Sequence, residues 1–385
     1  MSILFVLENA NLRGGTEIQS FNLLHALCTA GEDVWLLSLV PYEEEDEHVF
    51  SLSEEEYTQW TRTTNKIWNK LSFSILSDYV LRKILRKKIK ELKPSIVINQ
   101  TYDIITALPA EERVAQVFHW SVIGYEASLK SNINKKGLFV RYLSLFCEFG
   151  KRYRRHRILS RISKLIVLSN TAIGELKKLN IKVRDEQIAV IPNFLSKSKD
   201  SLIHSSLKNN NVVFVGRLSH EKGVLRLLRI WKRISHVMPQ LKLSIYGEGT
   251  ARSVMETYIR NENLQNVFFC GFCRSLDDIY THADLLLMTS DTEGFGLVLI
   301  EAMYFGVPCV SFDCPISPKE IIADAGITIS CFDEETYAQK IVETLLEGKT
   351  LKTLQRKAIC RARDFYLDKI IDKWIKLETH TICKE

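Results

Sequence analysis

Residues 188–216 read IAVIPNFLSKSKDSLIHSSLKNNNVVFVG, and this stretch decides how the chain is divided. One short apolar segment, Ile188–Ile191, ends at a Pro-Asn pair, and the next begins at Val212. Residues 196–211 between them are rich in Ser, Lys and Asn and poor in large apolar side chains, which is typical of a linker. The pattern predicts two domains with a boundary near residue 200.

Short β-branched apolar runs alternate with segments of helical periodicity on both sides of this linker. Before it, the expected strands are Ile3–Leu7, Val34–Leu39, Ile96–Asn99, Val114–Phe118, Leu165–Leu168 and Ile188–Ile191. After it, they are Val212–Val215, Leu241–Tyr246, Val267–Phe269, Asp284–Met288 and Pro308–Ser311. Nearly continuous apolar strands separated by crossover helices predict parallel sheets covered on both faces. The expected class is α/β, with two doubly wound, Rossmann-like domains.

The length of the chain supports this division. A chain of 385 residues exceeds the roughly 250–300 residues at which single cores usually stop growing. Residues 1–200 are predicted to form the N-terminal domain and residues 201–364 the C-terminal domain. The final segment, 365–385, has apolar side chains at helical spacing and is expected to complete the N-terminal domain.

Composition excludes several other classes of protein. The hydrophobic fraction of 46% and charged fraction of 25% are ordinary for a globular protein. No stretch is apolar enough for a membrane span, and Ile3–Leu7 is expected to be a first strand rather than a signal peptide. The pair Cys270-x-x-Cys273 has no second pair to complete a metal site, so no metal and a cytoplasmic location are expected.

The net charge of +6 is distributed unevenly along the chain. Two basic clusters fall in the N-terminal half: Arg82, Lys83, Arg86, Lys87, Lys88, Lys90 and Lys93, and then Lys151, Arg152, Arg154, Arg155, Arg157, Arg161 and Lys164. They are either solvated helix faces or a surface that attracts anionic phospholipid or a phosphate-bearing acceptor. Nucleic acid is not expected as a partner, because no recognition motif accompanies the charge.

Ligands of open α/β sheets bind beyond the carboxyl ends of the strands, so the residues after each strand are the first candidates. Gly14-Gly15-Thr16-Glu17 follows the first strand and opens a helical pattern, in which Thr16 and Gln19 fit a capping box. The free N–H groups of such a helix start can bind an anion. A Gly-Gly pair before a helix is also common as a simple turn.

The first strand of the second domain leads into Gly216-Arg217-Leu218-Ser219-His220-Glu221-Lys222-Gly223. Arg217 and Lys222 thus lie in one loop between a strand and a helix, where two cations could hold a diphosphate. Either residue alone would more simply be a surface cation in an ordinary ion pair.

A second glycine-containing turn follows Asp284–Met288, and two acids lie on either side of it. Glu293 is expected to project from the loop, and Glu301 to lie about two turns into the following helix. At that separation they would contact different parts of one ligand. A carboxylate accepts hydrogen bonds from paired ribose hydroxyls, and backbone N–H groups of Gly294–Leu297 can meet phosphate or sugar oxygens.

These segments together resemble the retaining glycosyltransferases of family 4, which have the GT-B fold, over nearly the whole chain. The matching segments are Gly14-Gly15-Thr16-Glu17, Phe118-His119, Ile191-Pro192-Asn193, Gly216-Arg217-Leu218, Glu221-Lys222-Gly223, Tyr246-Gly247-Glu248-Gly249 and the Glu-x7-Glu signature from Glu293 to Glu301. Ser317 departs from the pattern, because many polysaccharide-building relatives carry glycine there. That departure concerns the sugar side of the pocket.

The resemblance implies two domains facing across a cleft and assigns a role to each matching residue. Arg217 and Lys222 would bind the donor diphosphate, Glu301 the ribose and Glu293 the transferred sugar, while His119 would reach toward that sugar and the acceptor. The full expected donor site comprises Gly15, Arg217, Lys222, Gly247, Arg274, Glu293, Gly294, Phe295, Gly296, Leu297 and Glu301. The expected catalytic residues are His119, Glu293, Arg217 and Lys222.

The resemblance also implies a reaction. The leading hypothesis is metal-independent, retaining transfer of a hexose or N-acetylhexosamine from a nucleotide sugar, most simply a UDP-sugar, to a lipid-linked or growing surface glycan. The site of action would be the inner face of the cytoplasmic membrane, reached through the basic helices. The alternatives are a sugar-nucleotide epimerase of the same fold and a non-catalytic module that binds a sugar nucleotide.

Overall fold

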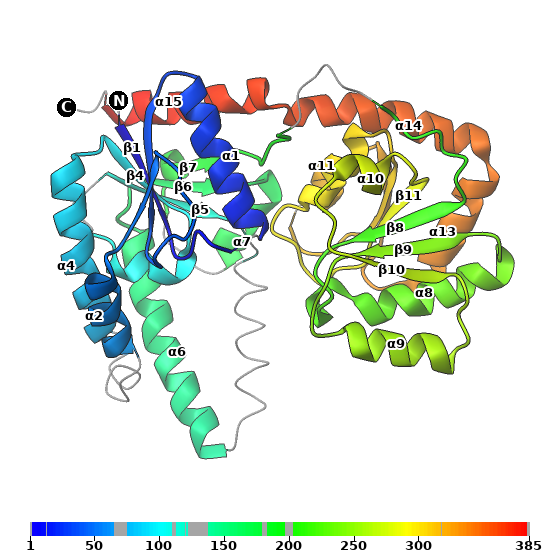
Figure 1. Ribbon diagram of the computed structural model, residues 1–385, viewed down its shortest axis with the longest axis horizontal. Coiled ribbons are helices and arrows are strands. Elements are labelled where there is room, and N and C mark those ends of the chain that lie inside the picture. The colour runs from blue at the N-terminus through cyan, green and yellow to red at the C-terminus, as the bar shows by residue number, and fades with distance from the viewer. Residues whose placement is uncertain are drawn as a thin grey trace. The chain divides into compact units, whose positions relative to one another are not determined.

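The computed structural model describes residues 2–12, 14–64, 75–109, 113–119, 121, 138–178, 183–196, 203–316 and 318–382. The chain forms two compact units, an N-terminal unit of Met1–Pro192 with Ile370–Glu385 and a C-terminal unit of Asn193–Lys369 (Figure 1). The boundary expected near residue 200 falls in 197–202, outside the described residues. Helix α15 (Leu367–Ile382) belongs to the N-terminal unit from Ile370 onward.

The N-terminal unit is built on a parallel sheet with the strand order β3-β2-β1-β4-β5-β6-β7. Its strands are β1 (Ser2–Leu7), β2 (Asp33–Ser38), β3 (Val49–Ser51), β4 (Ile96–Asn99), β5 (Val114–Phe118), β6 (Lys164–Val167) and β7 (Ile188–Val190). Every strand predicted for this half is confirmed. The short edge strand β3 was missed, because its three residues lie next to a strongly acidic segment that favours a solvated loop.

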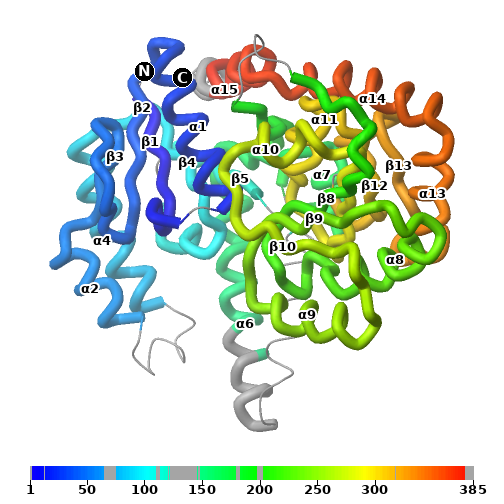
Figure 2. Tube along the Cα trace, turned by 45° about the vertical axis from the view of Figure 1, so that its right-hand side comes forward, coloured from blue at the N-terminus to red at the C-terminus, as the bar shows by residue number. Residues whose placement is uncertain are grey.

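The helices of this unit are α1 (Gly15–Thr29), α2 (Glu54–Thr64), α4 (Ile75–Leu92), α6 (Leu138–Leu159) and α7 (Asn170–Lys178). Helix α2 packs along α4 (Figure 2). The capping box predicted from Thr16 and Gln19 is wrong. Helix α1 already begins at Gly15 with Gly14 as its N-cap and no side-chain cap, so Thr16 lies inside the first turn.

The C-terminal unit is built on a second parallel sheet, with the order β10-β9-β8-β11-β12-β13. Its strands are β8 (Asn211–Val215), β9 (Lys242–Tyr246), β10 (Val267–Gly271), β11 (Leu285–Met288), β12 (Cys309–Phe312) and β13 (Gly326–Ile329). The predicted strands are again confirmed, and β13 was missed. Gly326 is the first residue of that strand. A Cβ at this position would lie 2.3 Å from the carbonyl oxygen of Cys309, so the close approach of the two strands requires glycine.

The helices of the C-terminal unit are α8 (Val224–Val237), α9 (Arg252–Asn261), α10 (Leu276–Tyr280), α11 (Leu297–Tyr304), α12 (Pro318–Ile322), α13 (Glu334–Leu346) and α14 (Gly348–Ala362). Helix α8 packs on α9 and α13, and α11 packs on α12 and α14. Leu227, Leu228, Trp231 and Ile234 of α8 are fully buried in the core. Truncating one such leucine to alanine typically costs about 2–5 kcal/mol, so α8 is firmly anchored to its sheet.

The strand order determines where a ligand could bind. In each sheet the chain changes direction along the sheet beside its first strand, between β1 and β4 in one unit and between β8 and β11 in the other. Loops that follow such a pair of strands diverge and leave a crevice at the carboxyl ends, which is the usual ligand position in open α/β sheets. No helix in the described part of the chain is long and apolar enough to cross a membrane.

Candidate active site

The loops that follow β8 and β9 are joined backbone to backbone. Gly216 N–H donates to Tyr246 O at 3.0 Å, and Leu218 N–H donates to Glu248 O at 2.8 Å. Gly247 has φ +130°, and a Cβ there would meet Gly216 O at 2.0 Å, so only glycine permits this approach. The Gly247 loop therefore lies directly against the loop that carries Arg217.

The loops that follow β8 and β11 are joined as closely. Gly223 has φ +63°, and a Cβ there would meet Thr289 O at 1.9 Å. Thr289 Oγ1 donates to Lys222 O at 3.1 Å, and Asp291 N–H donates to Glu221 O at 2.8 Å. Three loops of the C-terminal unit thus form one continuous edge at the carboxyl ends of β9, β8 and β11.

Lys222 and Glu293 meet at this edge. Lys222 Nζ lies 2.7 Å from Glu293 Oε1, and Ser290 Oγ donates to the same oxygen at 2.6 Å. The Glu293 side chain is only 9% exposed, so it does not project from the loop as predicted. The two donors occupy Oε1, which leaves Oε2 to accept a hydrogen bond from a ligand hydroxyl.

Arg217 lies in the same loop, directly after Gly216, and is exposed. Its guanidinium forms no hydrogen bond or ion pair within the described ranges. Among the described residues Arg217 therefore has no ion pair, whereas Lys222 is paired with Glu293. A guanidinium presents five donors in a planar fork that suits phosphate oxygens, so Arg217 is available for an anion.

The Glu-x7-Glu segment continues from this loop into α11. The helix begins at Leu297 after Gly296, whose φ of +86° favours glycine. Glu301 is therefore the fifth residue of α11, little more than one turn from its start, and the prediction of about two turns is wrong. The left-handed residue starts the helix later than the sequence suggested, which places Glu301 closer to its N-terminus.

The predicted backbone segment Gly294–Leu297 lies at this helix start. The Phe295 ring is buried and lies 5.7 Å from the Phe365 ring, so only the backbone at residue 295 can serve a ligand. Leu297 is the first residue of α11, where N–H groups lack partners within the helix. This start of α11 is suited to an oxygen-rich ligand.

Burial raises the pKa of Glu301 to about 7 although its side chain keeps some exposure. Tyr280 Oη lies 3.4 Å from Glu301 Oε2, and this hydrogen bond opposes the rise in the pKa. Glu301 therefore changes between neutral and charged forms near neutral pH. Ligand hydroxyls that donate to the carboxylate would favour the charged form.

The loop after β10 carries Arg274. Gly247 N–H donates to Gly271 O at 2.7 Å, which ties this loop to the Gly247 loop. Phe272 and Arg274 are both exposed, and Arg274 has no partner in the part of the chain that the structure describes. Gly247 and Arg274, both expected in the donor site, are thus brought to the same edge of the sheet.

The remaining predicted site residues belong to the N-terminal unit. Gly15 is exposed at the start of α1, and His119 directly follows β5. His119 Nε2 lies 2.6 Å from Gln100 Oε1, and burial lowers the pKa of His119 to about 4, so its ring is neutral at physiological pH. Their approach to a donor bound in the C-terminal unit stays a prediction. Ser317 lies outside the described residues.

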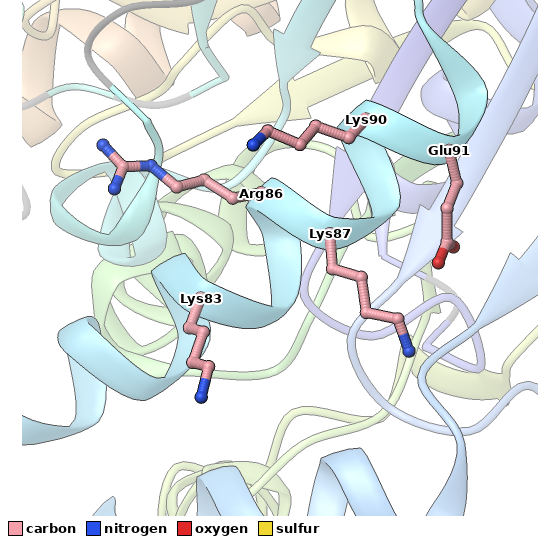
Figure 3. Close-up of a pocket in the computed structure, with 5 residues that line it drawn as sticks. All are labelled: Lys83, Arg86, Lys87, Lys90 and Glu91. Atoms are coloured by element: carbon pink, nitrogen blue, oxygen red, sulfur yellow. The ribbon is translucent and has the colours of Figure 1, made fainter.

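The first basic cluster lies on α4 except for Lys93, which directly follows the helix. The exposed side chains of Lys83, Arg86, Lys87, Lys90 and Glu91 leave this helix at helical spacing and line a hollow beside it (Figure 3). Lys83, Lys87 and Lys90 form no ion pair in the described part of the chain, whereas Lys88 lies 3.4 Å from Glu56 of α2. The cluster therefore presents a mainly cationic stripe to solvent.

The second basic cluster is partly used inside the N-terminal unit. Arg154 pairs with Asp78, Arg155 is buried and lies 3.3 Å from Asp103, and Lys151 lies 3.1 Å from Glu148. Arg154 and Arg155 thus join α6 to neighbouring elements, whereas the Lys151 pair lies within α6. These cations are less available to an external anion than the stripe on α4.

Three residues that matter to this site were not found from the sequence. Arg226 donates to Thr289 O and to Asp291 Oδ1, both at 2.8 Å, while Ser290 and Tyr280 contact the two acids. Ser290 lies three positions before Glu293, so the loop sequence could have indicated it. Arg226 and Tyr280 are distant in sequence from their partners, and no local pattern marks them.

Comparison with known proteins finds glycosyltransferases. The model of the family described as "Glycosyl transferases group 1" matches residues 198–361. An uncharacterized glycosyltransferase of Haemophilus influenzae is 24% identical over 96% of this chain and 98% of its own length. An alpha-1,4-N-acetyl-D-galactosaminyltransferase of Campylobacter jejuni, named for a PP-undecaprenol-linked glycan, is 27% identical over 98% of both chains.

A crystal structure of a TarM mutant of S. aureus, in complex with Fondaparinux, alpha-GlcNAc-glycerol and UDP, is similar in fold. Its TM-score is 0.73 at 16% sequence identity, covering 98% of this chain and 99% of TarM. Two Rossmann-like units and relatives of this kind define a glycosyltransferase with the GT-B fold. The residues that match the group 1 glycosyl transferases, 198–361, lie within the C-terminal unit. The predicted fold and enzyme class are confirmed, in preference to the epimerase.

Proposed function

We propose that this glycosyltransferase moves a hexose or an N-acetylhexosamine from a UDP-sugar to a lipid-linked or growing surface glycan. The observation that carries the proposal is the pair of cations in the loop after β8. Arg217 is exposed and has no partner among the described residues, and Lys222 of the same loop lies 2.7 Å from Glu293. Together they offer two positive charges to a diphosphate and a carboxylate to the sugar beside it.

The relatives support the choice of donor and acceptor. The Campylobacter jejuni relative is named for N-acetylgalactosaminyl transfer to a PP-undecaprenol-linked glycan, and the TarM crystal contains UDP. A lipid diphosphate acceptor and a uridine nucleotide donor are therefore the first candidates for this chain.

The proposed reaction retains the anomeric configuration and needs no metal. The bond between the anomeric carbon and the diphosphate breaks while the acceptor oxygen bonds to that carbon on the same face. The acceptor proton passes to the departing phosphate. Arg217, Lys222 and the start of α11 would stabilise the charge on the diphosphate, which is the task that a bound divalent cation performs in other transferases.

The two acids would orient the donor. Glu293 Oε2 can accept from a hydroxyl group of the transferred sugar, because Oε1 is already held by Lys222 and Ser290. Glu301 can accept from both ribose hydroxyls in its charged form. Gly247 and Arg274 would lie beside the nucleotide base of the donor. Gly15 and His119 of the N-terminal unit would contact the donor as well.

The test is release of nucleoside diphosphate with UDP-, GDP- and ADP-sugars in the presence of EDTA. Wild type is compared with Arg217→Ala and with Arg260→Ala, which removes an exposed arginine of α9 that has no described partner. We expect one donor to be consumed, Arg217→Ala to lose about 100-fold or more of the rate, and Arg260→Ala to match wild type. Equal rates for all three proteins would refute the proposal for Arg217, and dependence on added metal would refute metal independence.

We also propose that the protein acts as a peripheral protein at the inner face of the cytoplasmic membrane, with α4 facing anionic lipid. The support is the exposed stripe of Lys83, Lys87 and Lys90, to which Arg86 adds a fourth positive charge and Glu91 the one negative charge. A basic residue near an anionic membrane surface contributes roughly 1 kcal/mol to binding.

Co-sedimentation with phosphatidylglycerol vesicles tests this part. Replacing Lys83, Lys87 and Lys90 together by Glu should abolish binding. The control replaces Lys349, Lys352 and Arg356 by Glu, which reverses three exposed charges on α14 of the C-terminal unit and should leave binding intact. Unchanged binding of the α4 variant, or equal loss in both variants, would contradict a specific role for α4.

A further inference from the structure

Gln100 and His119 meet at the carboxyl ends of neighbouring strands. Gln100 directly follows β4 and His119 directly follows β5, which pairs with β4 in the sheet. His119 Nε2 lies 2.6 Å from Gln100 Oε1. Because an amide carbonyl oxygen can only accept, Nε2 must carry the hydrogen, and the neutral ring then has a bare lone pair on Nδ1.

The surroundings of the Gln100 side chain indicate that its role is the contact with His119. The residue is only 1% exposed, and its own amide Nε2 is buried without a hydrogen-bond partner among the described residues. An unsatisfied buried donor costs about 1–3 kcal/mol. Its backbone N–H donates to Val6 O at 2.9 Å, so the residue is anchored to β1. The described side-chain contact of Gln100 is with His119. A buried amide that destabilises the fold in this way is expected to have a specific role, and the contact indicates that this role is to orient His119.

Two neighbouring buried amides differ from Gln100. Asn99 Nδ2 donates to Gln116 Oε1 at 2.5 Å, and Gln116 Nε2 donates to Val117 O at 2.7 Å. These amides satisfy one another and the backbone, as buried polar groups usually do. Gln116 is therefore a matched control, since it is a buried glutamine of the same sheet with no described contact to His119.

We propose that Gln100 is a positioning residue that holds His119 as the Nε2-protonated tautomer and leaves Nδ1 to accept a hydrogen bond from a sugar hydroxyl. The proposal rests on the proposed function, in which His119 meets the donor sugar and the acceptor. His119 thereby acts as an acceptor rather than as a cation. Gln100 contacts no ligand and works through His119 alone.

Nuclear magnetic resonance of protein labelled with 15N-histidine tests the tautomer without any substrate. His119→Ala assigns the signals of His119. At pH 7 we expect a protonated Nε2 and a bare Nδ1 in wild type and in Gln116→Leu, and averaged signals of two tautomers in Gln100→Leu. A proton on Nδ1 in wild type would overturn the proposal, and so would a His119 spectrum unchanged by Gln100→Leu.

Gln100→Glu provides a second variant that keeps an acceptor in place. Its carboxylate should favour the imidazolium and raise the pKa of His119 by about one to three pH units. Retention of the pKa near its wild-type value of about 4 would contradict the contact. The readout is the same set of ring signals followed from pH 3 to 8.

Measurements of enzyme activity distinguish a failure of this proposal for Gln100 from a failure of the proposed function. Turnover is measured with the donor identified by the release assay. Introduced alone, Gln100→Leu should lower turnover about 10-fold, because His119 loses its orientation. Introduced into His119→Ala, it should have no further effect on turnover. Equal losses in both backgrounds would show that Gln100 does not act through His119. Wild-type turnover of His119→Ala would instead remove His119 from the proposed function and leave the tautomer result standing.

Discussion

Lys222 Nζ lies 2.7 Å from Glu293 Oε1, although the two residues are 71 positions apart in the sequence. They meet because β8 and β11 are neighbours in the sheet and their loops are locked together through Gly223 and Thr289. A lysine has three donors, so Lys222 can hold Glu293 and a diphosphate at once. The ion pair thus joins the part of the site suited to phosphate with the part suited to sugar.

Glu293→Gln should lower turnover strongly while changing the stability of the fold only slightly. The amide oxygen can still accept from Lys222 and Ser290, so stability should fall by only about 1 kcal/mol. Turnover with saturating donor should fall by roughly 100-fold, because the negative charge that orients the sugar and balances Lys222 is lost. The measurement is kcat together with urea unfolding.

A matched variant for this test is Glu334→Gln. Glu334 forms an ion pair with Arg229 in the same unit, with Arg229 Nε 3.0 Å from its carboxylate oxygens. It lies outside the proposed site, so turnover should stay at the wild-type level. A Glu293→Gln enzyme that is as active as Glu334→Gln would remove Glu293 from the mechanism.

Glu301→Gln should change how stability depends on pH. The folded-state pKa of Glu301 is raised by burial to about 7 from an ordinary value of 4.5, so the folded protein binds the proton more tightly than the unfolded chain. The resulting stabilisation is complete below pH 4.5 and is lost as pH rises through 7. Its magnitude is about 1–3 kcal/mol. Glutamine is neutral at every pH and should abolish this contribution.

Urea unfolding of wild type and Glu301→Gln at pH 5 and pH 8 measures the effect. The two proteins should have similar stability at pH 5, and Glu301→Gln should be the more stable at pH 8. Donor affinity should nevertheless fall in the variant, because a carboxylate accepts from two ribose hydroxyls and an amide oxygen does so less strongly. A constant stability difference between the two pH values would argue against the raised pKa of Glu301.

Gly223→Ala should damage both the fold and the site. Its φ of +63° is unfavourable for alanine, and the added Cβ would meet Thr289 O at 1.9 Å, a backbone atom that cannot yield easily. We expect a loss of about 2–4 kcal/mol and a weakened Lys222–Glu293 contact, seen as a raised KM for the donor.

Gly174→Ala is the opposite case. Gly174 lies inside α7, and a Cβ there would meet nothing within 4 Å. Alanine should stabilise the protein by about 0.5–1 kcal/mol without changing KM. Thermal unfolding of both variants checks the pair, and tolerance of Gly223→Ala would show that the loops are not locked as described.

Arg226→Met should loosen the loop that carries Glu293. The guanidinium holds Thr289 O and Asp291 and lies 3.9 Å from the centre of the Phe332 ring. Its loss should cost about 1–3 kcal/mol and raise the KM for the donor. Arg229→Met removes a more exposed ion pair, so it should cost at most about 1 kcal/mol and leave KM unchanged. Identical KM values would show that Arg226 does not position the site.

The strands were predictable from the sequence because parallel strands buried on both faces are nearly continuous apolar runs. The two that escaped, β3 and β13, are three and four residues long. Other strands of this length were predicted, but these two are not continuous apolar runs, since β3 ends in Ser51 and β13 contains Gly326 and Thr328. The start of α1 was misplaced because a serine or threonine near a glycine pair favours an N-cap, yet Gly14 takes that position.

The candidate site was predictable to the extent that each residue follows a strand or a glycine turn. Arg217, Lys222, Glu293 and Glu301 were found in this way. The burial of Glu293 and the raised pKa of Glu301 were not, because both depend on side chains contributed by other elements. Tyr280, which contacts Glu301, comes from α10 and has no sequence pattern that connects it with the site.

By itself, the sequence determined two Rossmann-like domains and predicted a boundary near the linker and the loops that would carry the chemistry. Those features depend on residue type and on local spacing, which the sequence contains directly. Only the tertiary structure decided that Lys222 is paired, that Arg217 has no partner among the described residues and that Gln100 contacts His119. The strands enter each sheet in an order that differs from their order in the chain, so partners at the carboxyl ends become neighbours only when the sheet forms.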